Sequence, residues 1–288
     1  MPELPEVETM RRGIAAVLGS VIGDVERFAP DYQPITIAPE WPKFCRRLRG
    51  KRIIGLSRAG KRVVLDLSGE HRLVIEPRMT GLVLVAEPPN QEHLRLRLSL
   101  RGGPVSHLMY WDRRGLGTVR LMTVGEFEER LGPEMLGPDA LEITSTDLRE
   151  RLCASRRAIK VALLDQRAVA GIGNLYASEI LHLARVHPAR RCDQVTRIQW
   201  EQVHIAMVKV LHEAILYEGS TLSDGTYRNA LNKAGGYQNE HRVYDRAEKQ
   251  CRTCGEAEIV RIVQAQRSTF FCPACQPKRA VGIKRRPR

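Results

Sequence analysis

Long apolar stretches are missing from this 288-residue chain, and no segment approaches the roughly 20 apolar residues that a membrane-spanning helix needs. The start of the chain also lacks the basic-then-apolar order of a secretory signal, because Glu3, Glu6 and Glu8 stand where the basic part would be. We therefore expect no membrane partner and a cytoplasmic location. The length is sufficient for two domains, each with its own core.

Acidic residues are too few to balance the basic ones. The chain has 33 Asp and Glu against 46 Lys and Arg, which is a formal net charge of +13 at pH 7. This excess predicts a polyanionic partner, and DNA is the first candidate. Charge alone leaves a ribosomal or an acidic-lipid partner open. The basic tail Lys278–Arg288 has no core-forming pattern, so we expect disorder there and at most a nonspecific DNA contact.

A disulfide-type distribution of cysteines is lacking too. Three of the seven cysteines, Cys45, Cys153 and Cys192, are isolated, and the other four are clustered near the C-terminus. This usage fits a reducing cytosol better than a disulfide-linked fold.

The clustered cysteines form two C-x2-C pairs: Cys251, Cys254, Cys272 and Cys275. Four thiolates at this spacing are typical of a tetrahedral Zn²⁺ site, and a pair of disulfides is the alternative. With all four positions filled by protein, the one zinc ion is expected to be structural and not to activate water. The stretches 259–263 and 268–271 predict the strands of a hairpin between the pairs. No organic cofactor is expected.

Segments in which every second residue is apolar dominate the N-terminal half. In Leu94–Arg101 leucine alternates with arginine or serine, so one face is apolar and the other is mostly basic. Most of these arginines are expected in solvent. The other predicted strands are 21–28, 52–57, 62–67, 73–76, 82–85, 107–111 and 118–121. Together with a helix over Val7–Leu18 that ends at Gly19, these short strands predict a β-sandwich or barrel.

Helical patterns follow the turn-rich stretch 132–139. One helix is predicted from a cap at Thr144 or Thr146 to about Ala154, and a second over 159–164. Another begins at the Gly171-Ile172-Gly173 turn. Such a turn leaves backbone N–H groups available to a phosphate, although most turns of this kind are simple connections.

The last predicted helix begins at a capping box formed by Thr196 and Gln199. Its apolar stripe, which ends before Gly219, is interpreted as core. The following segment, 218–240, is rich in Gly, Ser, Asn and Thr. An irregular segment of this length inside a compact domain is usually functional.

The first six residues, Met-Pro-Glu-Leu-Pro-Glu, are the strongest candidates for chemistry. Pro2 is small, so removal of Met1 is expected, and a secondary amine would then begin the chain. An α-amino group titrates near pH 8 and can act as a nucleophile that forms a Schiff base with a sugar carbon. Glu3 is a candidate general acid and base, and Glu6 a structural anchor. Considered alone, such a start is more often a frayed terminus.

Three segments resemble the formamidopyrimidine-DNA glycosylase family, and they occur along this chain in the same order as in that family. The opening run 1–9 resembles its N-terminus, Val169–Glu179 resembles its helix-two-turns-helix motif, and Gln266–Cys272 resembles its zinc-finger hairpin. The resemblance implies that Pro2 is the nucleophile. The sister family, endonuclease VIII, usually has glycine where this chain has Leu4, which favours the first family.

The resemblance also implies roles for residues of the N-terminal half. Lys61 matches a lysine near the sugar-phosphate of the lesion, and Met79 matches a methionine that enters the duplex when a base is flipped out. In the run Asp112–Gly117, Arg114 takes the place of the arginine that pairs with the orphaned base. Leu116 takes the place of a phenylalanine wedge, so this run departs from the family pattern.

In the C-terminal half the resemblance implies phosphate contacts from Asn174 and Arg267, and Lys160 matches a lysine that faces the DNA. The segment 218–240 resembles the family's flexible loop over the flipped base, but matches it too loosely to assign single contacts.

The expected fold is α+β and multidomain. The expected parts are a catalytic β-sandwich domain with a helix (1–131), a helical helix-two-turns-helix domain (132–247), a zinc-finger hairpin (248–276) and a basic disordered tail (277–288). The resemblance implies a monomeric bacterial DNA glycosylase with lyase activity that excises oxidised purines from damaged double-stranded DNA. The alternatives are an endonuclease VIII-like enzyme for oxidised pyrimidines and a noncatalytic zinc-finger DNA-binding protein.

Overall fold

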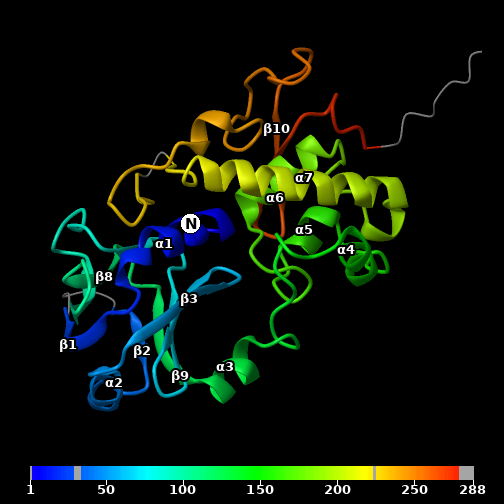
Figure 1. Ribbon diagram of the computed structural model, residues 1–288. Helices are drawn as coiled ribbons and strands as arrows, with labels where there is room; N and C mark the ends of the chain where they lie inside the picture. Colours follow the sequence, from blue (N-terminus) through cyan, green and yellow to red (C-terminus); the bar gives the residue numbers. More distant parts are fainter. Residues whose placement is uncertain (1, 29–33, 223–224, 279–288) are drawn as a thin grey trace, which may run out of the picture. The chain divides into compact units, whose positions relative to one another are not determined.

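The computed structural model describes residues 2–28, 34–222 and 225–278 (Figure 1). The chain divides into two compact units: Met1–Asp139 with Leu211–Asn239, and Ala140–Val210 with Glu240–Arg288. Met1, whose removal was expected, and residues 279–288 of the predicted tail lie outside the described residues. The division into four parts stays a prediction.

The first unit contains two β-sheets, as the period-two patterns predict. The four-stranded sheet has the order β1 (Val21–Arg27), β7 (Leu94–Arg101), β8 (His107–Asp112), β6 (Gly81–Leu84). The five-stranded sheet has the order β2 (Thr36–Ala38), β9 (Thr118–Thr123), β5 (His71–Glu76), β4 (Arg62–Leu67), β3 (Ile53–Ala59). All paired strands are antiparallel except β2 and β9, which are parallel. Strand β2 was not predicted, because it is only three residues long.

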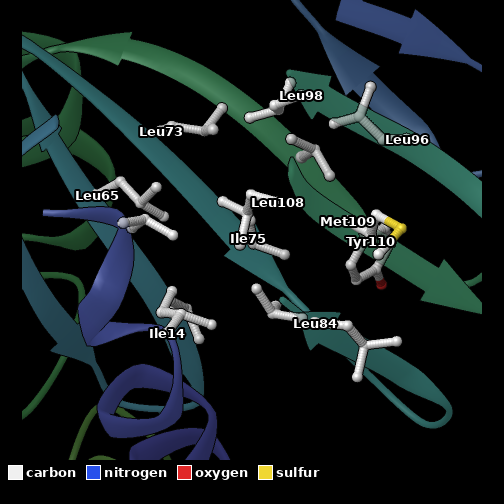
Figure 2. Packing of buried hydrophobic residues seen from close by; sticks show 14 of the residues in the cluster. Ile14, Leu65, Leu73, Ile75, Leu84, Leu96, Leu98, Leu108, Met109 and Tyr110 are labelled. Atoms are coloured by element: carbon white, nitrogen blue, oxygen red, sulfur yellow. The ribbon is translucent and has the colours of Figure 1, made fainter. Parts of the chain in front are cut away.

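The apolar faces of the two sheets form one core. Leu96 and Leu98 of β7 belong to the same buried cluster as Leu65, Leu73 and Ile75 of the other sheet (Figure 2). Each buried side chain of this size contributes about 1.5–3 kcal/mol relative to exposure. The alternating leucines of β7 therefore face the core, as the sequence pattern predicts.

Helix α1 (Leu4–Gly13) begins three residues before the predicted helix and is followed by a 3-10 turn, Ala15–Val17. Proline is accepted in the first turn of a helix, where its missing N–H has no partner to lose, and Pro5 occupies that place. Val7 and Met10 are fully buried in the core of the first unit. This packing holds the start of the chain in place instead of letting it fray.

Two short helices of the first unit were not predicted. Helix α2 (Trp41–Leu48) buries Phe44 and Leu48, and helix α3 (Val124–Leu131) follows β9 directly. The start of α3 is stabilised by Thr123, whose hydroxyl accepts the N–H of Glu126 at 3.2 Å.

The second unit is helical, with a β-hairpin near its end. Thr144 caps α4 (Ser145–Leu152), which confirms one of the two predicted caps. The other elements are α5 (Ile159–Leu163), α6 (Asn174–Leu183), the 3-10 turn Cys192–Gln194, and the hairpin strands β10 (Val260–Gln264) and β11 (Arg267–Phe271).

Helix α7 (Arg197–Leu216) begins at the predicted capping box. The N–H of Thr196 donates to Oε1 of Gln199 at 3.1 Å, and the N–H of Gln199 donates to the Thr196 hydroxyl at 3.2 Å. A 3-10 turn, Tyr237–Glu240, lies in the segment after α7. Among the helices that the structure describes, none is long and apolar enough to cross a membrane.

Candidate active site and nucleic-acid interface

The amino-terminal segment is held by the carboxylate of Glu6. Its Oε2 accepts the N–H of Glu3 at 2.9 Å, and its Oε1 accepts the N–H of Ser220 at 2.9 Å. Pro2 and Glu3 are buried. One buried carboxylate thus joins the start of α1 to the segment after α7, 214 residues away in sequence. Sequence reasoning placed Glu6 at this segment as an anchor but did not identify its second partner.

The backbone at Gly219 allows this arrangement. Gly219 has a φ of +80°, and a Cβ atom there would lie 2.9 Å from both Cγ and Oε1 of Glu6. It would also lie 3.0 Å from a ring carbon of Tyr227, whose hydroxyl donates to the carbonyl oxygen of Glu218 at 3.0 Å. Only glycine fits both the conformation and the space.

A charge network lies on the next turn of α1. Glu8 accepts hydrogen bonds from Arg11, Arg12 and Arg58, and Arg58 forms a bidentate pair with Asp139 at 2.6 and 2.9 Å. Burial acts to raise the pKa of Glu8, but the hydrogen bonds from Arg11 and Arg12 and the charges of Arg11 and Arg58 outweigh it and lower the pKa to about 2. Sequence reasoning missed this network, although the i, i+3 and i, i+4 spacing of Glu8 and its arginines was a readable signal.

Lys61 lies in the Gly60-Lys61 turn that joins β3 to β4. Helix α1 packs against both strands. The turn therefore belongs to the same part of the first unit as the amino-terminal segment, and Lys61 is half-buried there.

Met79 and Arg114, both expected to act where a base is flipped out, lie together in the structure. The guanidinium of Arg114 lies 3.0 Å from the sulfur of Met79, whose exposed fraction is 39%. The pairing of Gly81 with Asp112 between β6 and β8 places their loops side by side. Leu116 lies in the same loop as Arg114 and is half-buried.

Buried Asp112 shapes this pair of loops. Its carboxylate accepts the Thr80 hydroxyl at 2.5 Å, the N–H of Gly117 at 2.8 Å and the N–H of Arg114 at 3.2 Å. The Thr80 hydroxyl in turn accepts the N–H of Arg114 at 3.0 Å. The position of the Arg114 backbone is thus set from both loops.

Arg95 supports the loop from within the protein and departs from the prediction for its strand. The side chain is 1% exposed, and its Nε donates to the carbonyl oxygen of Asp112 at 2.8 Å. Arg97 and Arg101 follow the expectation better, because Arg97 pairs with Glu26 at the surface and Arg101 is exposed. The alternation of leucine and arginine in β7 does not show that the carbonyl oxygen of Asp112, on the neighbouring strand β8, is available to Arg95. The burial of Arg95 could therefore not be predicted from the sequence.

In the second unit, Lys160 and Asn174 lie together against the hairpin. The ammonium of Lys160 donates to Oδ1 of Asn174 at 2.5 Å, to the Thr269 hydroxyl at 2.7 Å and to the carbonyl oxygen of Ser268 at 3.1 Å. Lys160 is 1% exposed. Its contacts link α5 and the start of α6 to β11, and its predicted place facing the DNA stays a prediction. Arg267 is exposed at the start of β11.

The four clustered cysteines converge as the spacing predicts. Their sulfur atoms all lie within 4.8 Å of one another, with 3.9 Å between Cys251 and Cys275 and 3.7 Å between Cys254 and Cys272. Zn–S bonds of about 2.3 Å in a tetrahedron separate the sulfurs by about 3.8 Å, so this cluster fits one structural zinc ion. Burial, and after it the neighbouring thiols, raise the pKa of Cys272 and of Cys275.

Helix α6 supports the zinc cluster from one side. Nε2 of His182 lies 3.7 Å from the sulfur of Cys251, and burial lowers the pKa of His182 to about 4, so that the ring is neutral at pH 7. One turn earlier, the buried carboxylate of Glu179 accepts three backbone N–H groups, from Arg242, Val243 and Tyr244. Sequence reasoning assigned a role to neither side chain, because their partners are more than 60 positions away.

Three family models match the chain in series. They describe the formamidopyrimidine-DNA glycosylase N-terminal domain (residues 1–119), the formamidopyrimidine-DNA glycosylase H2TH domain (131–226) and a zinc finger found in FPG and IleRS (249–278). The formamidopyrimidine-DNA glycosylase of Chloroflexus aurantiacus is 41% identical over 282 residues, which cover 96% of this chain and 98% of the relative. The chain belongs to the formamidopyrimidine-DNA glycosylase family. The enzyme of the same name from Bacillus subtilis is 37% identical, over 97% of this chain and 100% of the relative.

Solved structures of the family agree with the fold. A Lactococcus lactis FPG mutant in complex with Fapy-dG-containing DNA superposes with a TM-score of 0.84 at 33% identity, covering 96% of this chain and 100% of that one. The MutM (FPG) protein of Thermus thermophilus superposes with a TM-score of 0.82 at 35% identity, covering 96% and 98%. The expected α+β fold, the DNA glycosylase class and the structural zinc site are thereby confirmed.

Proposed function

We propose that this family member is a bifunctional DNA glycosylase and lyase that removes oxidised purines, such as 8-oxoguanine and formamidopyrimidines, from duplex DNA through the amine of Pro2. The observation that carries the proposal is the anchoring of the amino-terminal segment by Glu6. A frayed terminus would need no buried carboxylate between Glu3 and Ser220.

The chemistry begins with nucleophilic attack by the Pro2 amine on C1′ of the damaged nucleotide. The C1′–N bond breaks as the base leaves with its electron pair and takes up a proton, and the amine gives up its own proton. The C1′–O4′ bond then breaks and O4′ takes up a proton, which leaves an iminium (Schiff base) between Pro2 and the opened sugar. Proton transfer between the sugar and the leaving base is assigned to Glu3. Loss of a C2′ proton then expels the 3′ phosphate, and a second elimination expels the 5′ phosphate. Water finally releases Pro2.

The loops around Asp112 are assigned the task of filling the gap that the extruded nucleotide leaves in the duplex. The damaged nucleotide must leave the stack, at a cost of a few kcal/mol. Met79 offers a flexible apolar side chain for the gap, and Arg114 offers donors to the orphaned base. Leu116 provides bulk without an aromatic face. The contact between Met79 and Arg114 supports this assignment.

Phosphate contacts are assigned to Asn174 and Arg267, with Lys160 holding Asn174 against the hairpin. Such contacts position the duplex and carry no sequence information. The zinc ion would stabilise the hairpin that presents Arg267. Arg267→Ala should therefore weaken DNA binding and flatten its salt dependence by about one unit of slope, whereas binding with an unchanged slope would contradict the assignment.

The chain acts as a monomer on damaged double-stranded DNA in a bacterial cytoplasm, bound to the nucleoid when engaged. Residues 1–131 form its catalytic domain, 132–247 its helical DNA-binding domain, 248–276 its zinc finger and 277–288 a basic tail. Lys61 is assigned to the sugar-phosphate of the lesion.

Borohydride trapping tests the nucleophile. With an 8-oxoguanine duplex, reduction should link protein to DNA covalently, and peptide mapping should find the adduct at Pro2. The same duplex without the lesion is the control. An adduct at Lys61 would overturn the assignment, and a lesion panel that shows excision of oxidised pyrimidines alone would favour the endonuclease VIII-like alternative. Glu3→Gln should suppress base removal while leaving DNA binding nearly intact.

A further inference from the structure

A small cavity of about 130 Å³ opens at the surface of the first unit where α2, β9 and α3 meet, and Lys43, Glu126 and Arg130 at its rim are exposed. Its charged lining residues are Lys43, Arg47, Arg120, Glu126 and Arg130. It lies on the side of the five-stranded sheet that carries α3, where Met122 belongs to a cluster separate from the main core. In Figure 1, α2 and α3 lie at the end of this unit away from α1, so the cavity is distinct from the amino-terminal site.

The four basic residues around this cavity come from three separate elements. Lys43 and Arg47 are one helical turn apart on α2, Arg120 comes from β9, and Arg130 comes from the last turn of α3. Like charges at i, i+4 on a helix destabilise it, and four gathered cations repel one another. An anion in the cavity would relieve that repulsion.

The protein neutralises these cations only in part, through the charge of Glu126 near Arg47 and Arg130. Within residues 2–28, 34–222 and 225–278, none of the four basic side chains donates a hydrogen bond or joins an ion pair. Glu126 is the only acidic residue of the described lining, and its carboxylate accepts the N–H of Thr123 at 2.8 Å. That hydrogen bond first, and then the charges of Arg47 and Arg130, lower the pKa of Glu126. With Glu126 ionised, the lining keeps a net charge of three positive units.

We propose that this cavity binds a phosphate group. Its volume is well below the roughly 300–1,000 Å³ of sites for drug-sized ligands, so it suits one compact anion. Three of its four cations are arginines, whose planar forks match phosphate oxygens bidentately. The phosphate is either a free anion or a backbone phosphate of a nucleic acid bound outside the lesion site. This activity is separate from the lesion chemistry and does not depend on Pro2.

The test is a titration of the full-length, zinc-loaded protein with inorganic phosphate at constant ionic strength, followed by NMR of the arginine Nε–H groups. Saturable shifts are expected, and Arg47→Gln or Arg120→Gln should weaken the apparent affinity at least fivefold. Arg46→Gln is the matched control, because Arg46 is exposed beside Arg47 on α2 but does not line the cavity. It should change the affinity by less than twofold.

A second titration, with an undamaged DNA duplex, identifies the source of the phosphate. If the backbone enters the cavity, the duplex shifts the same signals and competes with free phosphate. If the ligand is a free anion, the duplex leaves these signals in place while phosphate still shifts them. Both results support a phosphate site. Non-saturating shifts with both titrants, or equal losses from Arg46→Gln and Arg47→Gln, would overturn it.

Discussion

Gly219→Ala is the sharpest perturbation of the anchor that Glu6 forms, because one methyl group would press directly on it. The new Cβ atom would lie 2.9 Å from Cγ and Oε1 of Glu6. The Glu6 side chain would have to move and release the N–H of Ser220. The substitution thus acts on the amino-terminal segment from 213 positions away in sequence.

The expected decrease in the free energy of unfolding of Gly219→Ala has two separable parts. Placing alanine at a φ of +80° costs about 1–2 kcal/mol. Losing a buried hydrogen bond to the Glu6 carboxylate adds about 1.5–3 kcal/mol. Together the free energy of unfolding should fall by about 2.5–5 kcal/mol. Excision should slow as well, because Glu6 also holds the N–H of Glu3.

Gly19→Ala is the matched control for this experiment. Gly19 has a φ of +81°, and a Cβ atom there would have nothing within 4 Å. This variant therefore carries the backbone cost alone, about 1–2 kcal/mol, and should leave excision unchanged.

Urea denaturation and single-turnover excision of a lesion duplex would measure the two variants side by side. In a Glu6→Ala background the extra cost of Gly219→Ala should largely disappear, because the side chain it strikes is gone. If Gly219→Ala and Gly19→Ala differ by less than about 0.5 kcal/mol and excise equally fast, the reasoning about the Glu6 anchor is refuted.

Three further predictions concern acid stability, zinc and the wedge. Because the pKa of Glu8 is lowered from 4.5 to about 2, its contribution is complete above pH 4.5 and is lost as the pH falls towards 2. This contribution is about 2 kcal/mol after allowance for solvent around Arg11 and Arg12. Glu8→Gln should remove that part of the pH dependence in urea titrations from pH 6 to 3, and an unchanged slope would contradict the network. Cys272→Ser should release zinc and weaken lesion-duplex binding, measured by metal analysis and binding titration; normal binding by metal-free protein would contradict a structural zinc. Leu116→Ala should slow excision from a duplex but much less from an unpaired base, whereas Leu116→Phe should hold or improve affinity by adding stacking of about 1–3 kcal/mol. Equal excision by wild type and Leu116→Ala on both substrates would make Leu116 an ordinary loop residue.

Local patterns were sufficient for much of the fold. The strands Arg62–Leu67 and Leu94–Arg101 match their predicted bounds, and the Thr196–Gln199 box begins α7 as expected. These features depend on neighbours within a few positions, so a sequence pattern records them directly. The short strand β2 and the helices α2 and α3 were not predicted, because they contain too few residues to show a repeating pattern of apolar positions.

The zinc site was equally readable, because two C-x2-C pairs determine both the ligand atoms and the number of positions they fill. The amino-terminal chemistry required more than local pattern. A Met-Pro-Glu start by itself is ordinary, and the resemblance of three separated segments to one family gave it meaning.

The sequence by itself determined the alternation of buried and exposed residues, the helix caps, the metal ligands and the excess of positive charge. Only the tertiary structure decided which distant groups meet: Glu6 with Ser220, Arg95 with the carbonyl oxygen of Asp112, and Lys160 with Ser268. The physical reason is that a buried charged group must find its partner wherever the fold supplies one. A sequence shows the charge, but the distance along the chain to its partner is set by how sheets and helices pack.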